Sequence, residues 1–260
     1  MKTETEKSGR RSEAEWKRTV KMRAKEAGGI LTDLLFPRRC PVCDRPVKPF
    51  GRDICDACRS ALVPVREPRC LKCGKQLADA GAEYCYDCAH RRHVYDRGAA
   101  LYSYACIRQT VYRFKYGGRR EYARFLGRSL AENLGSLIRS WHPDALIPVP
   151  LHPQRELQRG YNQAELLALE LGKRLEIPVL SGYLVRVKRT RPQKELEGAA
   201  RQNNLKKAFK IVQDDVKLNT IVIIDDIYTT GSTIDAAALE CRAAGVRRVF
   251  FITLAIGKGL

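Results

Sequence analysis

The chain has 260 residues, of which 44% are hydrophobic, enough for one large domain or two modest ones with a packed core. Its 48 Lys and Arg outnumber its 29 Asp and Glu, and the net charge of +19 favours polyanionic partners: nucleic acid, phosphorylated metabolites or anionic lipid. The apolar runs fall short of the ~20 residues of a membrane helix and the N-terminus lacks the apolar core of a secretory signal, so we expect a soluble cytoplasmic protein.

Residues 1–39 are expected to form a basic arm that ends in a docking helix. Residues 1–28 are rich in Lys, Arg and Glu, with only a thin apolar face. Ser12 and Glu15 have the spacing of a capping box, which favours a helix within this arm. The apolar residues between 30 and 36 indicate a second, short amphipathic helix.

Residues 40–93 form a distinct region that holds eight of the ten cysteines. The eight form four CxxC pairs that recur every 15 residues, separated by polar residues that cannot bury enough surface to fold unaided. Disulfides are disfavoured in the cytoplasm, whereas two CxxC pairs complete a tetrahedral zinc site. We therefore predict a double zinc ribbon with two structural zinc ions; an iron–sulfur cluster or redox dithiols are the alternatives.

The order of the cysteine pairs favours sequential pairing, with a crossed arrangement as the alternative. In the sequential scheme one ion is held by Cys40, Cys43, Cys55 and Cys58, and the other by Cys70, Cys73, Cys85 and Cys88. All eight thiolates are then used as ligands, so no open position remains for catalysis. The two other cysteines, Cys106 and Cys241, are expected to be buried core thiols.

Residues 94–260 alternate between strand and helix patterns, which is typical of a parallel α/β sheet flanked by helices. We expect strands at 97–105, 145–150, 177–180, 183–188, 220–226 and 247–256, and helices at 107–116, 120–141, 162–175 and 232–245. Ligands of such sheets bind beyond the carboxyl ends of the strands. Residues 149–159 and 190–204 are expected to be polar loops.

The segment TIVIIDDIYTTGSTIDA, residues 220–236, combines features of a sugar-phosphate site. Asp225 and Asp226 end a buried strand side by side and repel each other unless a cation lies nearby. The hydroxyl-rich turn that follows opens a helix, whose free N–H groups and dipole favour a phosphate. The carboxylates suit a ribose diol with Mg²⁺ close by. The alternative is a capped helix with solvated aspartates. It does not explain why both aspartates occur together with the hydroxyl-rich turn.

Two resemblances to known families follow from these motifs. IVIIDDIYTTGST resembles the signature of type I phosphoribosyltransferases, which bind phosphoribosyl pyrophosphate (PRPP). LIPVPLHPQRELQRGYNQAELLA (146–168) and QNNLKKAF (202–209) resemble the ComF family, which joins N-terminal cysteine pairs to such a domain. The resemblance covers residues 31–260.

The resemblance implies a five-stranded parallel core with PRPP and Mg²⁺ bound at its edge. Asp225 and Asp226 would hold the ribose hydroxyls, and residues 190–204 would form a hood over the acceptor. The 5-phosphate would lie against Thr229, Thr230, Gly231, Ser232 and Thr233, and the pyrophosphate against Val149, Pro150, Leu151, Arg155 and Arg159. A solvated basic loop is the alternative for the two arginines.

One departure from the phosphoribosyltransferase pattern bears on the reaction. Enzymes that act on 6-oxopurines carry an aspartate at the position of Thr229, so the resemblance argues against purine salvage of that type. No catalytic acid or base is identified for any acceptor.

The ComF family is associated with natural transformation, which implies contact with single-stranded DNA. Residues 91–128 mix basic and aromatic side chains, as single-strand binding requires, although most of these aromatics are expected in the core. The DNA-binding candidates are Lys115, Tyr116, Arg119 and Arg120. Three hypotheses follow: a PRPP-binding handler of single-stranded DNA, a phosphoribosyltransferase with an unknown acceptor, and a zinc-ribbon adaptor that recruits a DNA-processing protein partner.

Overall fold

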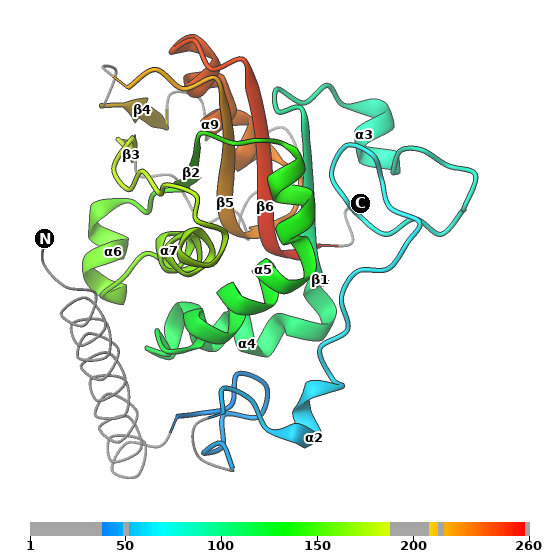
Figure 1. The fold of residues 1–260 in the computed structure, drawn as a ribbon, viewed down its shortest axis with the longest axis vertical. Coiled ribbons are helices and arrows are strands. Elements are labelled where there is room, and N and C mark those ends of the chain that lie inside the picture. The colour runs from blue at the N-terminus through cyan, green and yellow to red at the C-terminus, as the bar shows by residue number, and fades with distance from the viewer. Residues whose placement is uncertain (1–37, 49–51, 188–207, 213–215, 258–260) are drawn as a thin grey trace, which may run out of the picture. The chain divides into compact units, whose positions relative to one another are not determined.

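The structure is a computed structural model that describes residues 38–48, 52–187, 208–212 and 216–257 (Figure 1). It divides into two compact units, Met1–Arg59 and Ser60–Leu260. The predicted arm, docking helix and hood lie outside the described residues, as does most of the QNNLKKAF motif.

The first unit contains the first four-cysteine group, whose last member, Cys58, lies in the short helix α2 (Asp56–Arg59). The backbone folds back on itself at the first CxxC pair, where Cys40 N–H donates to Arg45 O at 2.8 Å and Asp44 N–H donates to Cys40 O at 2.8 Å. An ion pair of 3.2 Å between Arg38 and Asp53 closes the loop. These bonds shape a small loop around thiols rather than a hydrophobic core.

The second unit is built on a four-stranded sheet in which all neighbouring strands are parallel. Its strand order is β1 (Arg97–Ser103), β6 (Arg248–Ile256), β5 (Thr220–Tyr228), β2 (Ala145–Pro148). The central strands β5 and β6 are buried along most of their length, as their continuous apolar runs predict for a sheet covered on both faces. The parallel sheet expected from the sequence is confirmed.

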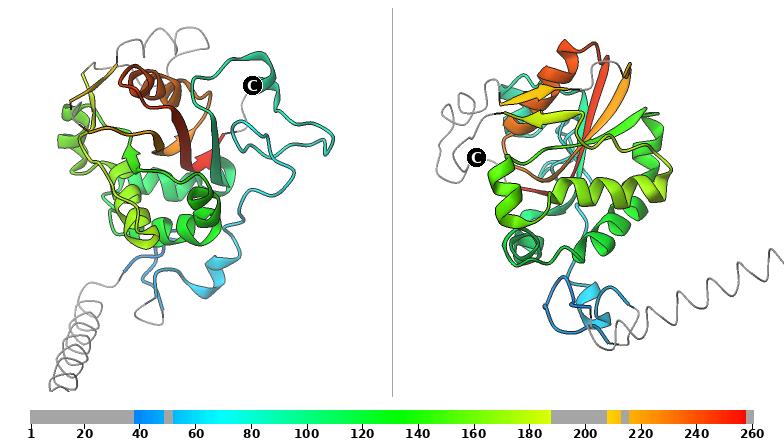
Figure 2. Two further views of the ribbon diagram at one scale, coloured as in Figure 1. Left: turned by 45° about the horizontal axis from the view of Figure 1, so that its top comes forward. Right: turned by 90° about the vertical axis from the view of Figure 1, so that its left-hand side faces the viewer.

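Helices cover both faces of this sheet (Figures 1 and 2). The amphipathic helices α5 (Tyr122–Ser140) and α7 (Gln163–Leu175) pack together on one face, and α9 (Ser232–Ala243) lies on the other. The helix α4 (Tyr104–Tyr116) follows β1 directly and ends at Gly117. None of the helices in the described ranges is long and apolar enough to span a membrane.

Three segments differ from the sequence expectations. Val179 makes only one parallel bridge, to Leu146, before the chain turns away, so the described sheet has four strands instead of five. The strand expected next in the chain, β3 (Leu184–Arg186), pairs antiparallel with β4 (Phe209–Ile211) outside the main sheet. The loop at 149–159 contains a short helix, α6 (Pro153–Arg159), because proline at the first helical position presets the backbone angle.

The second four-cysteine group, with its short helix α3 (Tyr86–His90), is packed into the core of the second unit. Val65 N–H donates to Leu101 O at 2.8 Å, so the chain before this group runs along β1. Gly74 has a φ of +73°, and a Cβ there would lie 2.7 Å from the Cα of Ala99. This contact leaves room only for glycine, and it presses the second cysteine loop directly onto the sheet.

The two cysteines outside the CxxC pairs have different surroundings. Cys241 is buried in α9, as expected, and burial raises the pKa of its thiol to about 12. Cys106 is exposed, so the prediction of a core thiol there is wrong. The helix α4 begins at Tyr104, two residues before Cys106, and its first turn leaves Cys106 on the solvent side.

Candidate functional site

A cavity of about 350 Å³ opens where β2 and β5 end, at the carboxyl edge of the sheet. It brings together residues from the acidic pair, the hydroxyl-rich turn and the loop after β2. The predicted site residues that line it are Asp225, Asp226, Thr229, Thr233, Val149, Pro150, Leu151, Arg155 and Arg159. Two motifs far apart in the sequence therefore face one space, as neighbouring strands of a parallel sheet allow.

Lys115 supplies the cation that the acidic pair requires. It comes from the last turn of α4, and its Nζ lies 2.6 Å from Oδ2 of Asp226. Lys115, which the sequence suggests as a DNA-binding candidate, lines the cavity. Its spacing from the buried Ile107 and Val111, four residues at a time, is the signal that it lies on the inner face of the helix.

The acidic pair is strongly perturbed. Burial, followed by the charge of Asp226, raises the pKa of Asp225 to about 8, although Lys115 opposes the shift. Burial disfavours the charged form of Lys115, but its ion pair with Asp226 outweighs this and raises the pKa of the lysine. The backbone N–H of Asp226 also donates to Oδ1 of Asp225 at 2.8 Å. Without a ligand, Asp225 therefore keeps its proton near pH 7, so the acidic pair carries less negative charge than two ionised aspartates would.

Stability is expected to fall with rising pH because of Asp225. Its pKa is about 8 in the folded state and ~3.9 in an unfolded chain, so folding retains a proton that unfolding releases. The resulting stabilisation is full below pH ~4 and is lost as the pH rises through 8. Between pH 5 and pH 8.5, the neutral variant Asp225→Asn should gain on the order of 4 kcal/mol relative to wild type in urea unfolding. A difference that does not change with pH would contradict the raised pKa.

The hydroxyl-rich turn, residues 229–233, is called the phosphate turn below. Gly231 has a φ of +79° and precedes the first residue of α9. A Cβ at Gly231 would lie 2.7 Å from the Tyr228 hydroxyl oxygen, so the turn requires glycine for space as well as for conformation. Thr229, Gly231, Ser232 and Thr233 line a small hollow there, while the Thr230 hydroxyl bonds to that of Ser232 at 2.9 Å.

Three arginines line the cavity, and two of them are predicted from the sequence. Arg155 and Arg159 lie one turn apart on α6. The third, Arg186, reaches the cavity from β3, with its guanidinium 5.4 Å from the centroid of the Phe209 ring. Burial, with a contribution from Arg155, lowers the pKa of Arg186. The sequence around Arg186 predicts a short strand but does not indicate that this side chain faces a cavity. Its orientation depends on the pairing of β3 with β4, which lies more than twenty residues further along the chain.

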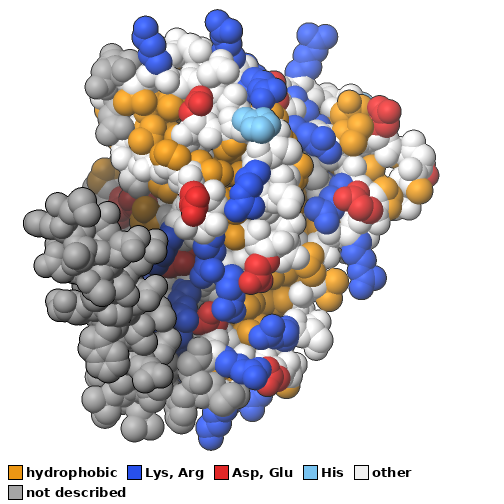
Figure 3. Space-filling model, viewed as in Figure 1, with side chains coloured by type: hydrophobic (Ala, Val, Ile, Leu, Met, Phe, Trp, Pro, Cys, Tyr) orange, Lys and Arg blue, Asp and Glu red, His pale blue; other side chains and the backbone are white. Residues whose placement is uncertain are grey.

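The DNA-binding candidates other than Lys115 lie at or near the surface. Tyr116 is 61% exposed and Tyr112 is 56% exposed, and their ring centroids are 5.2 Å apart. The other aromatics between 91 and 128 are buried or half-buried, as expected. Arg120 is exposed and Arg119 is half-buried. Lys and Arg side chains recur over the face shown in Figure 3.

The eight paired cysteines form two groups with the geometry of zinc sites. Within each group the sulfur atoms lie within 4.8 Å of one another, and the groups match the sequential pairing predicted from the sequence. Cys43 and Cys55 have a sulfur–sulfur distance of 4.0 Å, and Cys73 and Cys85 one of 3.7 Å. A tetrahedral zinc ion with ~2.3 Å bonds separates its sulfurs by ~3.8 Å, so the residues fit zinc.

The purified chain is expected to contain two zinc ions. A Cys73→Ser variant removes one thiolate from the second group and should contain one ion, measured by elemental analysis. Cys241→Ser is the matched control, because Cys241 lies outside both groups, and it should retain two. Iron in place of zinc, with visible absorption, would contradict the zinc assignment.

Several known proteins are similar to this chain over most of its length. Competence protein F of Haemophilus influenzae is 30% identical over 220 residues, which cover 82% of this chain and 95% of that protein. The chain belongs to the ComF family. The DNA utilization protein YhgH of Salmonella typhimurium is 32% identical over 205 residues, covering 77% of this ComF-family chain and 89% of the relative. Competence protein ComFC of Bacillus subtilis is 28% identical over 245 residues, covering 82% and 90%.

The family model of the double zinc ribbon domain matches residues 31–89 of the ComF-family chain. Together with the two cysteine groups, this match supports two structural zinc sites. Among solved structures, a purine phosphoribosyltransferase from Pyrococcus horikoshii Ot3 aligns at 20% identity with a TM-score of 0.30, covering 50% of this chain and 69% of its own. A hypoxanthine phosphoribosyltransferase from Staphylococcus aureus aligns at 14% identity with a TM-score of 0.33, covering 53% and 64%.

Proposed function

We propose that this chain binds PRPP with Mg²⁺ in the cavity at the end of β5, and that it handles single-stranded DNA in the cytoplasm during natural transformation. One observation carries the first part: a single cavity is lined by the acidic pair, by Thr229 and Thr233 of the phosphate turn, and by arginines from α6 and β3. The names of the relatives, competence protein F and DNA utilization protein, support the second part.

Each part of PRPP has a chemically suitable partner in the cavity. The carboxylates of Asp225 and Asp226 accept hydrogen bonds from the two ribose hydroxyls. The N-terminus of α9 and the hydroxyls of the phosphate turn donate to the 5-phosphate. Arg155 and Arg159 neutralise the pyrophosphate, and Mg²⁺ near the carboxylates reduces the repulsion between the negative charges.

Calorimetric titration of the purified chain with PRPP tests this proposal. Binding that requires Mg²⁺ and saturates at one ligand per chain is expected. Ribose 5-phosphate, which lacks the pyrophosphate, should bind more weakly because Arg155 and Arg159 lose their partner. Absence of heat and of any thermal shift with PRPP and Mg²⁺ would reject the PRPP site.

The exposed tyrosines of α4 are the proposed stacking platform for single-stranded DNA. Tyr112 and Tyr116 present two neighbouring rings to solvent, and bases of any sequence can stack on such rings. Arg159 lies with its guanidinium 5.1 Å from the centroid of the Tyr116 ring. Because Tyr116 and Arg159 also line the cavity, the DNA path adjoins the PRPP site.

Replacing Tyr112 and Tyr116 by alanine is expected to weaken single-strand binding by roughly tenfold for each lost stacking partner. Fluorescence anisotropy with a labelled oligothymidine measures the change. Tyr86→Ala is the matched control, because Tyr86 is also exposed, at 69%, but lies on α3. Affinity that falls equally in both variants, or in neither, would reject α4 as the platform.

Phosphoribosyl transfer to an unidentified acceptor is the second candidate. The raised pKa of Asp225 favours it, because perturbed carboxyl groups in clefts are typical of catalytic sites. Release of pyrophosphate that depends on an added acceptor distinguishes transfer from binding alone. The zinc ribbons are the proposed surface for a DNA-processing protein partner, since their metal sites have no open position for chemistry.

A further inference from the structure

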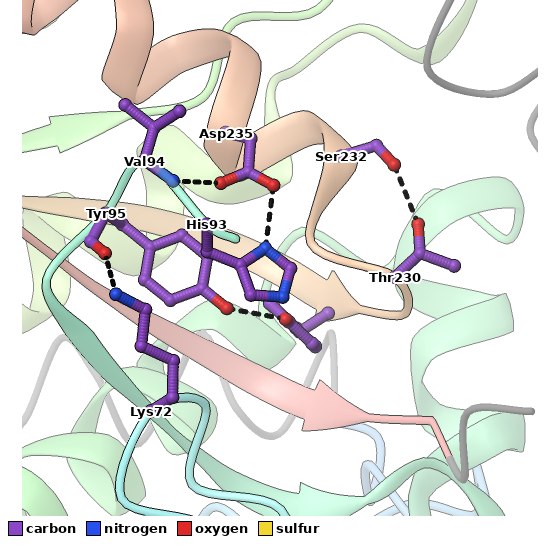
Figure 4. Close-up of polar contacts among 8 residues, drawn as sticks. Lys72, His93, Val94, Tyr95, Thr230, Ser232 and Asp235 are labelled. Atoms are coloured by element: carbon purple, nitrogen blue, oxygen red, sulfur yellow. Dashed lines mark hydrogen bonds and ion pairs between the residues drawn. The ribbon is translucent and has the colours of Figure 1, made fainter. Parts of the chain in front are cut away.

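The segment 93–95 joins the second four-cysteine group to β1, and it contacts the first turn of α9 (Figure 4). His93 Nδ1 donates to Oδ2 of Asp235 at 2.8 Å, and the backbone N–H of Val94 donates to Oδ1 of the same carboxylate at 2.8 Å. Both oxygens of Asp235 are therefore held by this segment. The backbone N–H of Asp235 in turn donates to Gly231 O at 2.8 Å, so the anchored residue also shapes the phosphate turn.

A second contact joins the same segment to the end of β5. The hydroxyls of Tyr95 and Tyr228 share a hydrogen bond of 2.7 Å, and both rings are buried. Tyr228 is the last residue of β5 and directly precedes the phosphate turn. The ring of Tyr228 is also stacked on Phe251, with centroids 4.9 Å apart, so it has little freedom to move without Tyr95.

His93 fills the space behind Gly231. A Cβ at Gly231 would lie 2.9 Å from Cε1 of His93 and 2.7 Å from the Tyr228 hydroxyl oxygen. The His93 side chain is only 1% exposed, and its Nε2 is buried without a hydrogen-bond partner among the described residues. A buried, unpaired nitrogen is costly. The imidazole is thus held through Nδ1 and packing rather than through a complete set of hydrogen bonds.

The second cysteine loop holds the other end of this segment. Lys72, between the ligands Cys70 and Cys73, donates from Nζ to Tyr95 O at 2.5 Å, and Gly98 N–H donates to Lys72 O at 2.9 Å. Cys73 itself is fully buried in the same core. Direct contacts therefore join the conformation of this loop to that of Tyr95 and its neighbours.

We propose that His93 is a positioning residue that couples zinc binding at the second four-cysteine group to anion binding at the phosphate turn. This inference rests on the proposed PRPP site. If the second loop loosens, residues 93–95 release Asp235, whose charge then lies unpaired in the first turn of α9 and opposes a phosphate at that helix N-terminus. By linkage, a bound anion must stabilise the zinc-loaded loop to the same extent.

Calorimetric titration of zinc-loaded full-length chain with PRPP and Mg²⁺ tests the role of His93. His93→Ala is expected to weaken PRPP binding roughly tenfold, within the usual range of coupling between sites. His93→Asn keeps an N–H donor at the position of Nδ1 and removes the unpaired nitrogen, so its affinity should stay within roughly threefold of wild type. His90→Ala is the matched control, because His90 is exposed and, among the described residues, its ring bonds to Tyr86 O in its own helix.

Zinc release provides a readout that does not depend on PRPP affinity alone. The two groups can be separated with Cys43→Ser, which removes a ligand of the first group and leaves the second intact. In this variant, PRPP should raise the affinity for the remaining zinc roughly tenfold, measured by equilibrium competition with a coloured chelator. In the corresponding Cys73→Ser variant, the zinc of the first group should be bound with the same affinity with and without PRPP.

The outcomes separate this inference from the proposed function. If wild type binds PRPP and His93→Ala binds it equally well, the coupling is rejected while the PRPP site stands. If His93→Asn is as weak as His93→Ala, the bond from Nδ1 to Asp235 is not the link. If wild type does not bind PRPP, the proposed function fails and this inference fails with it.

Discussion

Replacing both Asp225 and Asp226 by asparagine is expected to weaken PRPP binding by at least ~100-fold. Each carboxylate accepts a charge-assisted hydrogen bond from a ribose hydroxyl in the proposed complex, and such a bond contributes ~1.5–3 kcal/mol. Two of them correspond to roughly two or more powers of ten in affinity. Asparagine keeps the size of the side chain, so the cavity should retain its shape. Calorimetry with PRPP and Mg²⁺ measures the loss.

The control for this variant is Glu132→Gln, which also changes a carboxylate to an amide. The Glu132 side chain is 64% exposed on α5 and lies outside the cavity. Its affinity for PRPP should equal that of wild type. If the doubly substituted protein binds PRPP as tightly as the control does, the acidic pair is not a ribose site, and the proposed function loses the observation that carries it.

Replacing Lys115 by methionine is expected to lower the free energy of unfolding by roughly 3 kcal/mol, because it leaves the Asp226 carboxylate buried without its cation. The two side chains are only 21% and 10% exposed, so solvent cannot fully replace the lost ion pair. Urea unfolding at pH 7 in the absence of ligand measures the change. The combined variant Lys115→Met with Asp226→Asn should recover most of the loss, since no unpaired charge then remains.

Lys173→Met is the matched control for Lys115, because Lys173 is an exposed lysine in the last turn of α7. Its effect should stay within ~0.5 kcal/mol. The two roles considered for Lys115 give opposite results. If Lys115→Met is as stable as wild type and instead loses affinity for single-stranded DNA, Lys115 belongs to the nucleic-acid surface and its ion pair with Asp226 contributes little.

The zinc sites and the sheet were predictable from short-range patterns. A CxxC pair brings two thiolates together within one tight loop, so the ligand type follows from spacing, whereas the choice between sequential and crossed pairing was decided by the structure. The alternation of apolar strands with amphipathic helices likewise depends on each segment's own periodicity, and it predicted the parallel sheet. The prediction of a fifth strand was wrong, because the sequence of residues 177–180 does not show how far this segment pairs with its neighbour in the sheet.

The sequence by itself determined the cysteine ligands and the parallel sheet, and it placed the acidic pair in the last part of a buried strand, although β5 continues two residues further, to Tyr228. Only the tertiary structure decided that Lys115 faces Asp226, that Arg186 lines the cavity, and that His93 holds Asp235 behind the phosphate turn. The first set depends on contacts between residues a few positions apart, where chain geometry leaves few choices. The second depends on the packing of elements that are distant in sequence, which no local pattern records.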